Sequence, residues 1–362
     1  MTLKKILYKI FLAVNVFFAL TLLISYLAVH ISPGVFALPA FFGLAYPYLL
    51  LINVIIVITW IALLRFEALI SVIVIAIGFN HFSNYIKLRK PSGDKSNTFK
   101  VFSYNVRLFN YYETKNGVYS VKRVVDFIKS QNPDIICLQE FFILGNPSLE
   151  EADLIKGLGG KYNSHMRLKK ISKNRYYGII TLSKFPIITR GEILHSSSSS
   201  LSIFSDIVIQ KDTFRIFNNH LQSFMLKRMD RSFLEEMAVS EDKETVDEVR
   251  SLSRSLRNGF ARRSLQAELV KSYVNTSPHP VIVAGDFNDT PVSYAYRKIR
   301  KGLNDSFVTS GYGAGFTYRG NYPPNRIDYI LYDNNLLNTY FEIIRIRYSD
   351  HYPIVAYFRM KN

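Results

Sequence analysis

The sequence of 362 residues predicts an α/β domain behind an apolar, membrane-spanning N-terminal segment. Residues 1–95 are dominated by apolar runs, whereas residues 96–362 mix apolar and polar residues as soluble domains do. Within 96–362, short β-branched runs alternate with stretches of helical periodicity. No internal repeat of fixed period is visible.

Two or three transmembrane helices are expected within residues 1–90. Residues 6–29 have about the length of a membrane span, and 35–64 form a second apolar stretch. Residues 66–86 are a weaker third candidate. Residues 91–98 are polar, with Pro, Gly and Ser, and are predicted to be a linker to the domain 99–362. We therefore expect an integral protein of the cytoplasmic membrane that contacts lipid through residues 1–90.

The orientation in the membrane depends on the number of spans. Lys4, Lys5 and Arg65 favour the cytoplasmic side, and three spans would then place the C-terminal domain outside the cytoplasm. Lys87 and Lys90 favour the opposite orientation, in which only two segments span. We expect the domain to be extracytoplasmic.

The elements of the domain follow from periodicity and turn residues. Residues 224–258 are charged, with irregular helical spacing, and are predicted to be a helical insertion or a solvated surface excursion. Strands are expected at 99–105, 134–138, 178–183, 201–210, 214–219, 281–288, 327–332, 341–347 and 353–359, and helices at 121–130, 262–274 and 292–300.

One stretch, Val281 to Pro291, organises the interpretation. Four apolar residues form a buried strand, Gly285 ends it, and Asp286 and Asn288 follow. On an extended backbone these two side chains point to the same side, with Phe287 turned into the core. An acid beside an amide can bind a hard cation, orient a water or hold a phosphoryl oxygen. A simple turn is the alternative, because Gly, Asp, Asn and Pro are turn formers.

Other predicted strands also end in polar residues, which suggests a single site along one rim of a sheet. Glu140 and Asp350 offer hard oxygen ligands for Mg²⁺ or Mn²⁺. His220 and His351 can hold or transfer a proton near neutral pH, and Asp328 could fix an imidazole tautomer. The complete set is Asn105, Glu140, His220, Asp286, Asn288, Asp328, Asp350 and His351.

Composition excludes some classes of site. The single cysteine, Cys137, excludes an intrachain disulfide, and no Cys–His spacing suggests zinc. No Gly-rich loop suggests a nucleotide cradle. Eight basic and two acidic residues in 1–95 leave +11 of the total charge of +17 to the remaining chain, which attracts phosphate-bearing partners.

The strand-end residues lie within six tracts that resemble the motif set of the endonuclease/exonuclease/phosphatase family. The tracts occur in that family's order and cover about residues 99–360. They are Ser-Tyr-Asn-Val-Arg (103–107), Ile-Cys-Leu-Gln-Glu (136–140), Asn-Asn-His-Leu-Gln-Ser (218–223), Ala-Gly-Asp-Phe-Asn (284–288), Arg-Ile-Asp-Tyr-Ile (326–330) and Ser-Asp-His-Tyr-Pro (349–353).

The resemblance implies a four-layer α/β sandwich of two mostly antiparallel sheets, as in deoxyribonuclease I, and a metal-dependent hydrolase of phosphoric esters. It implies that Asn105, Glu140 and Asp350 form the environment of Mg²⁺ or Mn²⁺. Asp286 would position or deprotonate the attacking water, with Asn288 beside it steadying the phosphate. His351, oriented by Asp328, and His220 would stabilise charge on the phosphorus.

These motifs fix the chemistry better than the substrate. A membrane-anchored phosphoesterase acting on a phospholipid headgroup or another phosphoester is the first hypothesis. A membrane-tethered nuclease for DNA or RNA is the second, supported by the basic domain and by the aromatic residues Phe316, Tyr318 and Tyr322, although packing explains these aromatics more simply. A catalytically silent scaffold is the third, and the intact polar set argues against it. No obligate protein partner is evident.

Overall fold

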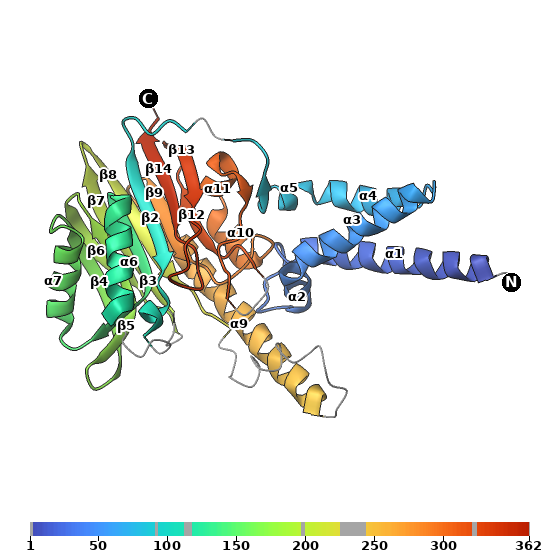
Figure 1. Cartoon of the computed structure of the whole chain (residues 1–362), viewed down its shortest axis with the longest axis horizontal. Coiled ribbons are helices and arrows are strands. Elements are labelled where there is room, and N and C mark those ends of the chain that lie inside the picture. The colour runs from blue at the N-terminus through green and yellow to red at the C-terminus, as the bar shows by residue number, and fades with distance from the viewer. Residues whose placement is uncertain are drawn as a thin grey trace.

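The computed structural model describes residues 3–90, 93–111, 118–196, 200–224, 244–320 and 324–361. Two six-stranded sheets form the centre of the C-terminal domain (Figure 1). The first sheet has the order β13-β14-β2-β3-β5-β4, and the second has the order β10-β12-β9-β8-β7-β6. The strands are β2 (Phe99–Asn105), β3 (Ile135–Leu144), β4 (Asn163–Ser172), β5 (Arg175–Ser183), β6 (Ile187–Ile193), β7 (Leu201–Ile209), β8 (Asp212–His220), β9 (Val281–Asp286), β10 (Asn304–Asp305), β12 (Asp328–Tyr332), β13 (Leu336–Ile343) and β14 (Ile354–Met360).

Helices cover the outer face of each sheet, so the domain has four layers. In the core between the sheets, Val101 and Cys137 of the first sheet meet Ile216 and Ile282 of the second. The outer face of the first sheet is covered by α6 (Val118–Gln131) and α7 (Pro147–Gly157). The outer face of the second is covered by α9 (Glu244–Asn275) and α10 (Tyr294–Arg300). The predicted four-layer sandwich is confirmed.

Each sheet contains one parallel pair of neighbouring strands within an otherwise antiparallel order. β2 runs parallel to β3 in the first sheet, and β8 runs parallel to β9 in the second. Parallel neighbours end at the same edge of a sheet, and here both pairs end at the same rim of the sandwich. This topology brings together residues from distant parts of the sequence.

The elements expected from the sequence are present, with shifts at their ends. The expected strand 341–347 is β13, which begins five residues earlier at Leu336 and ends at Ile343. The strands β4 and β6 and the helices α7 and α11 (Ser306–Ser310) were not predicted. β4 lies at a sheet edge, and its residues are half-buried or exposed without regular alternation, so its sequence carries little strand signal.

The predicted insertion at 224–258 is only partly described, because residues 225–243 lie outside the described residues. From Glu244 the structure shows one continuous helix, α9, that extends to Asn275. The separate helix expected at 262–274 is therefore the second half of a longer one. The first half projects from the domain in Figure 1, where an exposed helix needs no regular apolar stripe.

The N-terminal segment is helical, but it contains fewer candidate spans than the two or three expected. α1 (Leu3–Leu27) is long and apolar enough to cross a membrane, and α2 (Leu38–Leu44) and α3 (Tyr46–Ala62) pass the same criterion only as one span bent by 67°. The third expected span is instead α4 (Ala68–Ile77), of ten residues, followed by the short α5 (Phe79–Phe82). Ten residues rise about 15 Å, half the thickness of a bilayer core. The count is therefore one, or two if the bent pair is one span.

Side-chain hydrogen bonds hold these helices together. Ser71 of α4 lies 2.6 Å from Asn15 Oδ1 of α1 and 2.8 Å from Asn53 Oδ1 of α3, and all three residues are buried. The outward surfaces carry exposed apolar residues such as Ile58 and Ile73. Such a polar interior with an apolar exterior suits helices surrounded by lipid.

The segment contacts the domain directly. Figure 1 shows α1, α3 and α4 projecting side by side away from the sandwich. At their base, β1 (Ile86–Lys87) pairs with β11 (Gly313–Ala314) of the domain. The buried guanidinium group of Arg326 donates to the carbonyl oxygen of Asn84 at 3.0 Å. The polar residues 91–98 thus follow a point at which the chain is already bound to the domain.

Candidate active site

The candidate site lies where the two parallel strand pairs end. Asn105 is the last residue of β2, and His220 and Asp286 are the last residues of β8 and β9. Asp328 begins the antiparallel neighbour β12 and stands directly opposite Asp286. Glu140 lies within β3 rather than at its end, at a bulge where its φ is 50°. This bulge reorients one side chain within a strand, as bulges commonly do near active sites.

Asp286 is the centre of the cluster. Its Oδ2 accepts hydrogen bonds from the side-chain amides of Asn105 at 2.9 Å and Asn288 at 3.2 Å. The Nε2 atoms of His351 and His220 lie 3.8 and 3.9 Å from the same oxygen. Burial, opposed by the charge of His351, raises the pKa of Asp286 to about 6. A carboxylate with this pKa is still ionised at pH 7 but is a stronger base than an exposed aspartate.

The backbone after Asp286 forms a turn that also brings the side chains of Asp286 and Asn288 together, as predicted. Asn288 has a φ of 52°, and its backbone nitrogen donates to Asp286 Oδ1 at 2.7 Å. The two side chains therefore meet through an Asx turn and not through an extended backbone. Phe287 is fully buried, as expected. Gly285 has a φ of 130°, and a Cβ there would lie 2.0 Å from the carbonyl oxygen of Asn219, so no other residue fits.

His351 and Asp328 form a buried pair beside Asp286. The Nδ1 atom of His351 lies 2.9 Å from Asp328 Oδ2 and 3.2 Å from Oδ1. Burial alone would lower the pKa of His351, but the charges of Asp328 and Asp286 raise it well above its ordinary value. At neutral pH the ring is therefore a cation whose Nε2 faces Asp286. The ring of Tyr318 packs edge-on against it at 5.2 Å.

His220 and Glu140 form a second cationic and anionic pair. His220 Nε2 lies 3.4 Å from Glu140 Oε1, and neither ring nitrogen of His220 has a hydrogen-bond partner among the described residues. Burial opposes the shift, but His220 lowers the pKa of Glu140 to about 2, and Glu140 and Asp286 raise the pKa of His220. Buried polar atoms without partners indicate room for a ligand or ordered water.

Asn105 and Asp350, the other two predicted metal ligands, do not direct a free oxygen toward Glu140. The Nδ2 atom of Asn105 points to Glu140 at 3.2 Å and to Asp286, while its Oδ1 accepts from the backbone of Arg107. In this orientation Asn105 holds the two carboxylates as a donor. Asp350 Oδ2 lies 3.3 Å from Arg107 Nε. No described contact joins the Asp350 side chain to Glu140 or Asp286, so its ligand role stays a prediction.

The donor chemistry of the site fits a hard divalent cation. The site holds three acidic side chains, Glu140, Asp286 and Asp328, and Glu140 keeps 27% of its side-chain surface exposed. One oxygen each from Asp286 and Asp328 and one nitrogen from His351 also lie within 4.8 Å of one another. In that second cluster the Nδ1 atom of His351 is already bonded to Asp328. The ionised Glu140 is therefore the better ligand.

Several residues that support the site carried no clear signal in the sequence. The hydroxyl of Thr317 accepts hydrogen bonds from the backbone nitrogens of Ile327 and Asp328, and Ser349 Oγ accepts from the backbone nitrogen of His351. Arg263 of α9 is fully buried and bonds to Asp289. Isolated Thr, Ser and Arg residues are common on surfaces, so only the tertiary structure identifies these.

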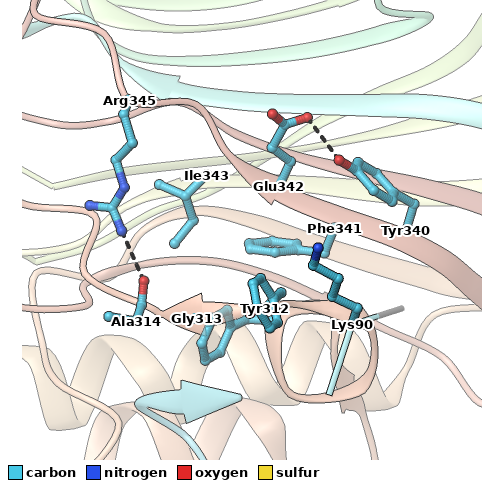
Figure 2. Close-up of a pocket in the computed structure, with 10 residues that line it drawn as sticks. Lys90, Tyr312, Gly313, Ala314, Tyr340, Phe341, Glu342, Ile343 and Arg345 are labelled. Carbon is cyan, nitrogen blue, oxygen red and sulfur yellow. Dashed lines mark hydrogen bonds between the residues drawn. The ribbon is translucent and has the colours of Figure 1, made fainter. Parts of the chain in front are cut away.

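A cleft of about 410 Å³ lies apart from this cluster and is lined by none of the eight predicted residues. Figure 2 shows Lys90 and Tyr312 at its mouth, Tyr340 bonded to Glu342, and Arg345 bonded to the carbonyl oxygen of Ala314. Its cationic and anionic groups already have neighbours within the chain. Among the described residues, the strand-end cluster combines a buried His220 nitrogen without a hydrogen-bond partner and an ionised Glu140, so it is the better candidate site.

Comparison with known proteins supports this assignment. A family model described as Endonuclease/Exonuclease/phosphatase family matches residues 102–351. A second, described as a domain of unknown function (DUF8431), matches residues 8–85. Among curated proteins, none matches the chain.

Solved structures share the fold of the domain. A family protein from Leptotrichia buccalis C-1013-b superposes with a TM-score of 0.52 at 17% identity, over 73% of this chain and 100% of its own. Humanized D. rerio TDP2 gives 0.52 at 17%, over 73% and 100%. The human Nocturnin catalytic domain with bound sulfate anion gives 0.52 at 18%, over 78% and 98%. With a family model matching more than two thirds of its length, the chain belongs to the endonuclease/exonuclease/phosphatase family and is a hydrolase of phosphoester bonds.

Proposed function

We propose that the protein is a membrane-anchored, divalent-cation-dependent phosphoesterase that attacks a phosphoester with a water activated by Asp286. The arrangement around Asp286 carries the proposal. Its buried carboxylate has a raised pKa and lies within 4 Å of two imidazoles whose own pKa values are raised by neighbouring carboxylates. A base beside two cations provides both halves of phosphoryl transfer, which depends on positioning and electrostatics.

Asp286 is suited to accept the proton of the attacking water. Its two amide donors, Asn105 and Asn288, fix the orientation of the carboxylate. Its pKa of about 6 keeps it ionised at pH 7 while bringing its basicity closer to the working pH. Asn288 also donates to the carbonyl oxygen of Leu221 at 3.0 Å, which ties the base to the segment that follows His220.

The two imidazoles are suited to bind phosphoryl oxygens. His351 is fixed through its Nδ1 by Asp328, which leaves Nε2–H directed toward the centre of the site. His220 has one close neighbour at Nε2, Glu140 at 3.4 Å, and its Nδ1 has no hydrogen-bond partner among the described residues. As negative charge develops on the phosphoryl oxygens, both cations stabilise it.

Glu140 would hold the cation, and Asn105 and Asp350 are the remaining predicted members of its environment. A bound Mg²⁺ or Mn²⁺ would supply positive charge for the phosphoryl oxygens and the leaving group. The chain's own contribution is an ionised Glu140, whose pKa is lowered to about 2 and which stays charged throughout the neutral range.

We favour a substrate at the bilayer surface, such as a phospholipid headgroup. The loop immediately after Asn288 contacts α2 of the N-terminal segment, so the site lies beside the base of the helices. A membrane-tethered nuclease is the second candidate, supported by the basic domain and by Tyr318 against His351. Of the other aromatics considered, Phe316 packs on Tyr85, and Tyr322 lies outside the described residues.

We further propose that the domain is extracytoplasmic. Arg65 lies over the ring of Tyr8 at 5.5 Å, which places Arg65 and the N-terminal lysines at the end of the helices opposite the domain. The excess of Lys and Arg at that end favours the cytoplasm, and with α1 as the one full span the domain then lies on the other side. A reporter fused after the last residue that registers inside the cytoplasm would reverse the assignment.

The function is tested on the full-length protein in lipid nanodiscs. DNA, RNA, sphingomyelin, glycerophospholipids and a soluble chromogenic phosphodiester are assayed with Mg²⁺, each beside the Asp286→Asn variant. Turnover of a lipid, abolished by the substitution and by chelator, supports the first candidate, and turnover of nucleic acid alone supports the second. No turnover of any phosphoester by a folded, Mg²⁺-supplemented protein contradicts the proposal.

A further inference from the structure

We propose that α2 of the N-terminal segment is a positioning element of the active site, so that the membrane segment completes the catalytic geometry as well as anchoring the chain. The proposal rests on the phosphoesterase function above. Two sets of contacts carry it. One joins Gly43 to the loop after Asn288, and the other joins Phe41 to a buried arginine that binds both catalytic strand ends.

Gly43 lies directly against the catalytic loop. A Cβ at this position would lie 2.4 Å from the carbonyl oxygen of Val292 and 2.6 Å from the Cβ of Ala28. The hydroxyl of Thr290 also approaches the carbonyl oxygen of Gly43 at 3.5 Å. Val292 is fully buried and Thr290 nearly so. Only glycine permits this approach of α2 to residues two and four positions beyond Asn288.

The second set of contacts runs through α9. The ring of Phe41 packs edge-on against Phe260 at 5.3 Å, and Phe260 lies beside the guanidinium group of Arg263. Arg263 Nε donates to Asp289 Oδ2 at 3.0 Å, and Nη1 donates to the carbonyl oxygen of Gln222 at 2.8 Å. Asp289 follows Asn288, and Gln222 is two residues after His220. Arg263 therefore connects the segments that carry the base and one of the cations.

This connection is rigid because its members are buried. Arg263 has no exposed surface and Asp289 almost none, so water cannot replace their contacts. Asp286 and His220 come from neighbouring strands, and just beyond the strands Leu221 bonds to the backbone of Asp286 and to the side chain of Asn288. Arg263 adds the next contacts along both loops, at Gln222 and Asp289. The contacts of Arg263, seated on Phe260 and α2, hold these loops at a fixed separation. Displacements of about 1 Å at reacting groups can reduce turnover by about a hundredfold.

The test compares two glycines of the same segment. Gly43→Ala forces α2 away from the Val292 carbonyl oxygen. Gly34→Ala is the matched control, because its Cβ would lie 3.7 Å from its nearest neighbours, the hydroxyls of Ser32 and Ser264. Both variants are made in the full chain, reconstituted in nanodiscs, and assayed on a soluble chromogenic phosphodiester, so that lipid access does not enter. We expect kcat to fall about tenfold or more for Gly43→Ala, with KM within about twofold, and no change for Gly34→Ala.

The split between kcat and KM, read beside the melting temperature, separates positioning from general destabilisation. A displaced catalytic loop should lower kcat while KM and the melting temperature stay close to those of Gly34→Ala. Should Gly43→Ala fail to insert or fold, Phe41→Leu removes the ring contact with Phe260, and its control is Phe36→Leu at an exposed position of the same segment.

Each outcome is decisive. An active parent with folded Gly43→Ala and Phe41→Leu variants that match their controls in kcat would overturn the inference while leaving the proposed function intact. An inactive parent on every phosphoester would instead remove the proposed function. Loss of kcat with retained KM and an unchanged melting temperature supports α2 as a positioning element.

Discussion

Replacing Asp286 by Asn tests the centre of the site. The substitution is nearly isosteric but removes the base, and losses of general-base catalysis run to about 10²–10⁴-fold. We therefore expect kcat to fall by that factor, equivalent to about 3–5 kcal/mol in the barrier. A turn residue would show no such loss, because Asn favours the same turns as Asp.

The stability of Asp286→Asn follows from two opposing effects. The Asp286 carboxylate accepts three hydrogen bonds and donates none. In Asp286→Asn the new NH₂ group would therefore face an N–H donor in place of an acceptor, which destabilises the fold by about 1–3 kcal/mol. Against this, the pKa of Asp286 rises from 3.8 to about 6, which destabilises the folded state above that pH by about 3 kcal/mol. The substitution removes that penalty, so the variant should match the parent to within about 2 kcal/mol at pH 7.

The sign of the pH dependence is also fixed. A raised folded-state pKa means that the stabilising contribution of Asp286 is present below its unfolded pKa of 3.8 and is lost as pH rises through about 6. The parent should therefore gain stability relative to Asp286→Asn as the pH falls from 7 to 4. Thermal unfolding in nanodiscs at both pH values measures this difference.

The assay uses the soluble phosphodiester at fixed Mg²⁺, with Asp212→Asn, at an exposed hairpin turn, as the matched control. The control should keep full kcat. A folded Asp286→Asn variant that retains more than about a tenth of parental turnover would remove Asp286 from the mechanism.

Three further outcomes are expected. Glu140→Gln removes the exposed ionised ligand and should raise the Mg²⁺ concentration needed for half-maximal activity, and chelator should abolish parental turnover until Mg²⁺ or Mn²⁺ is restored; full activity in excess chelator would refute the metal assignment. Asp328→Asn removes the charge that raises the pKa of His351, so the alkaline limb of kcat/KM should move to lower pH by about one unit or more. If that limb does not move, Asp328 does not control the protonation of His351 in the reaction. Full-length protein should stay with membranes after carbonate washing, because α1 is long and apolar enough to span, and its release would exclude an integral anchor.

Much of the site could be predicted because local rules and topology agree there. A short apolar strand followed by Asp286 and Asn288 predicts polar groups at a strand end, and the parallel pairs then bring such ends together. The sequence offers a simple turn and a paired functional site as alternatives at Asp286 and Asn288. The structure has both, because the backbone nitrogen of Asn288 donates to the Asp286 carboxylate and so closes the turn. The position of Glu140 depends on a bulge, and β-bulges leave no reliable mark in a sequence.

The contacts between the N-terminal segment and the domain could not be predicted, for a different reason. A polar stretch at 91–98 reads as a flexible tether, but Asn84 and β1 are bound to the domain before that stretch begins. Gly43, Val292 and Arg263 lie in unrelated parts of the chain, and each has an ordinary local role in the sequence. Only the packed structure shows that they belong to one assembly.

The bond between Arg326 and Asn84 has a consequence for how the protein is made. The two residues are separated by 242 positions, so at about 5–20 residues per second the ribosome supplies Arg326 roughly 10–50 s after Asn84. During that interval the helices can enter the membrane while their docking partner does not yet exist. β2 waits similarly for β14, its neighbour from the end of the chain. In the membrane-anchored protein that we propose, insertion would therefore precede docking.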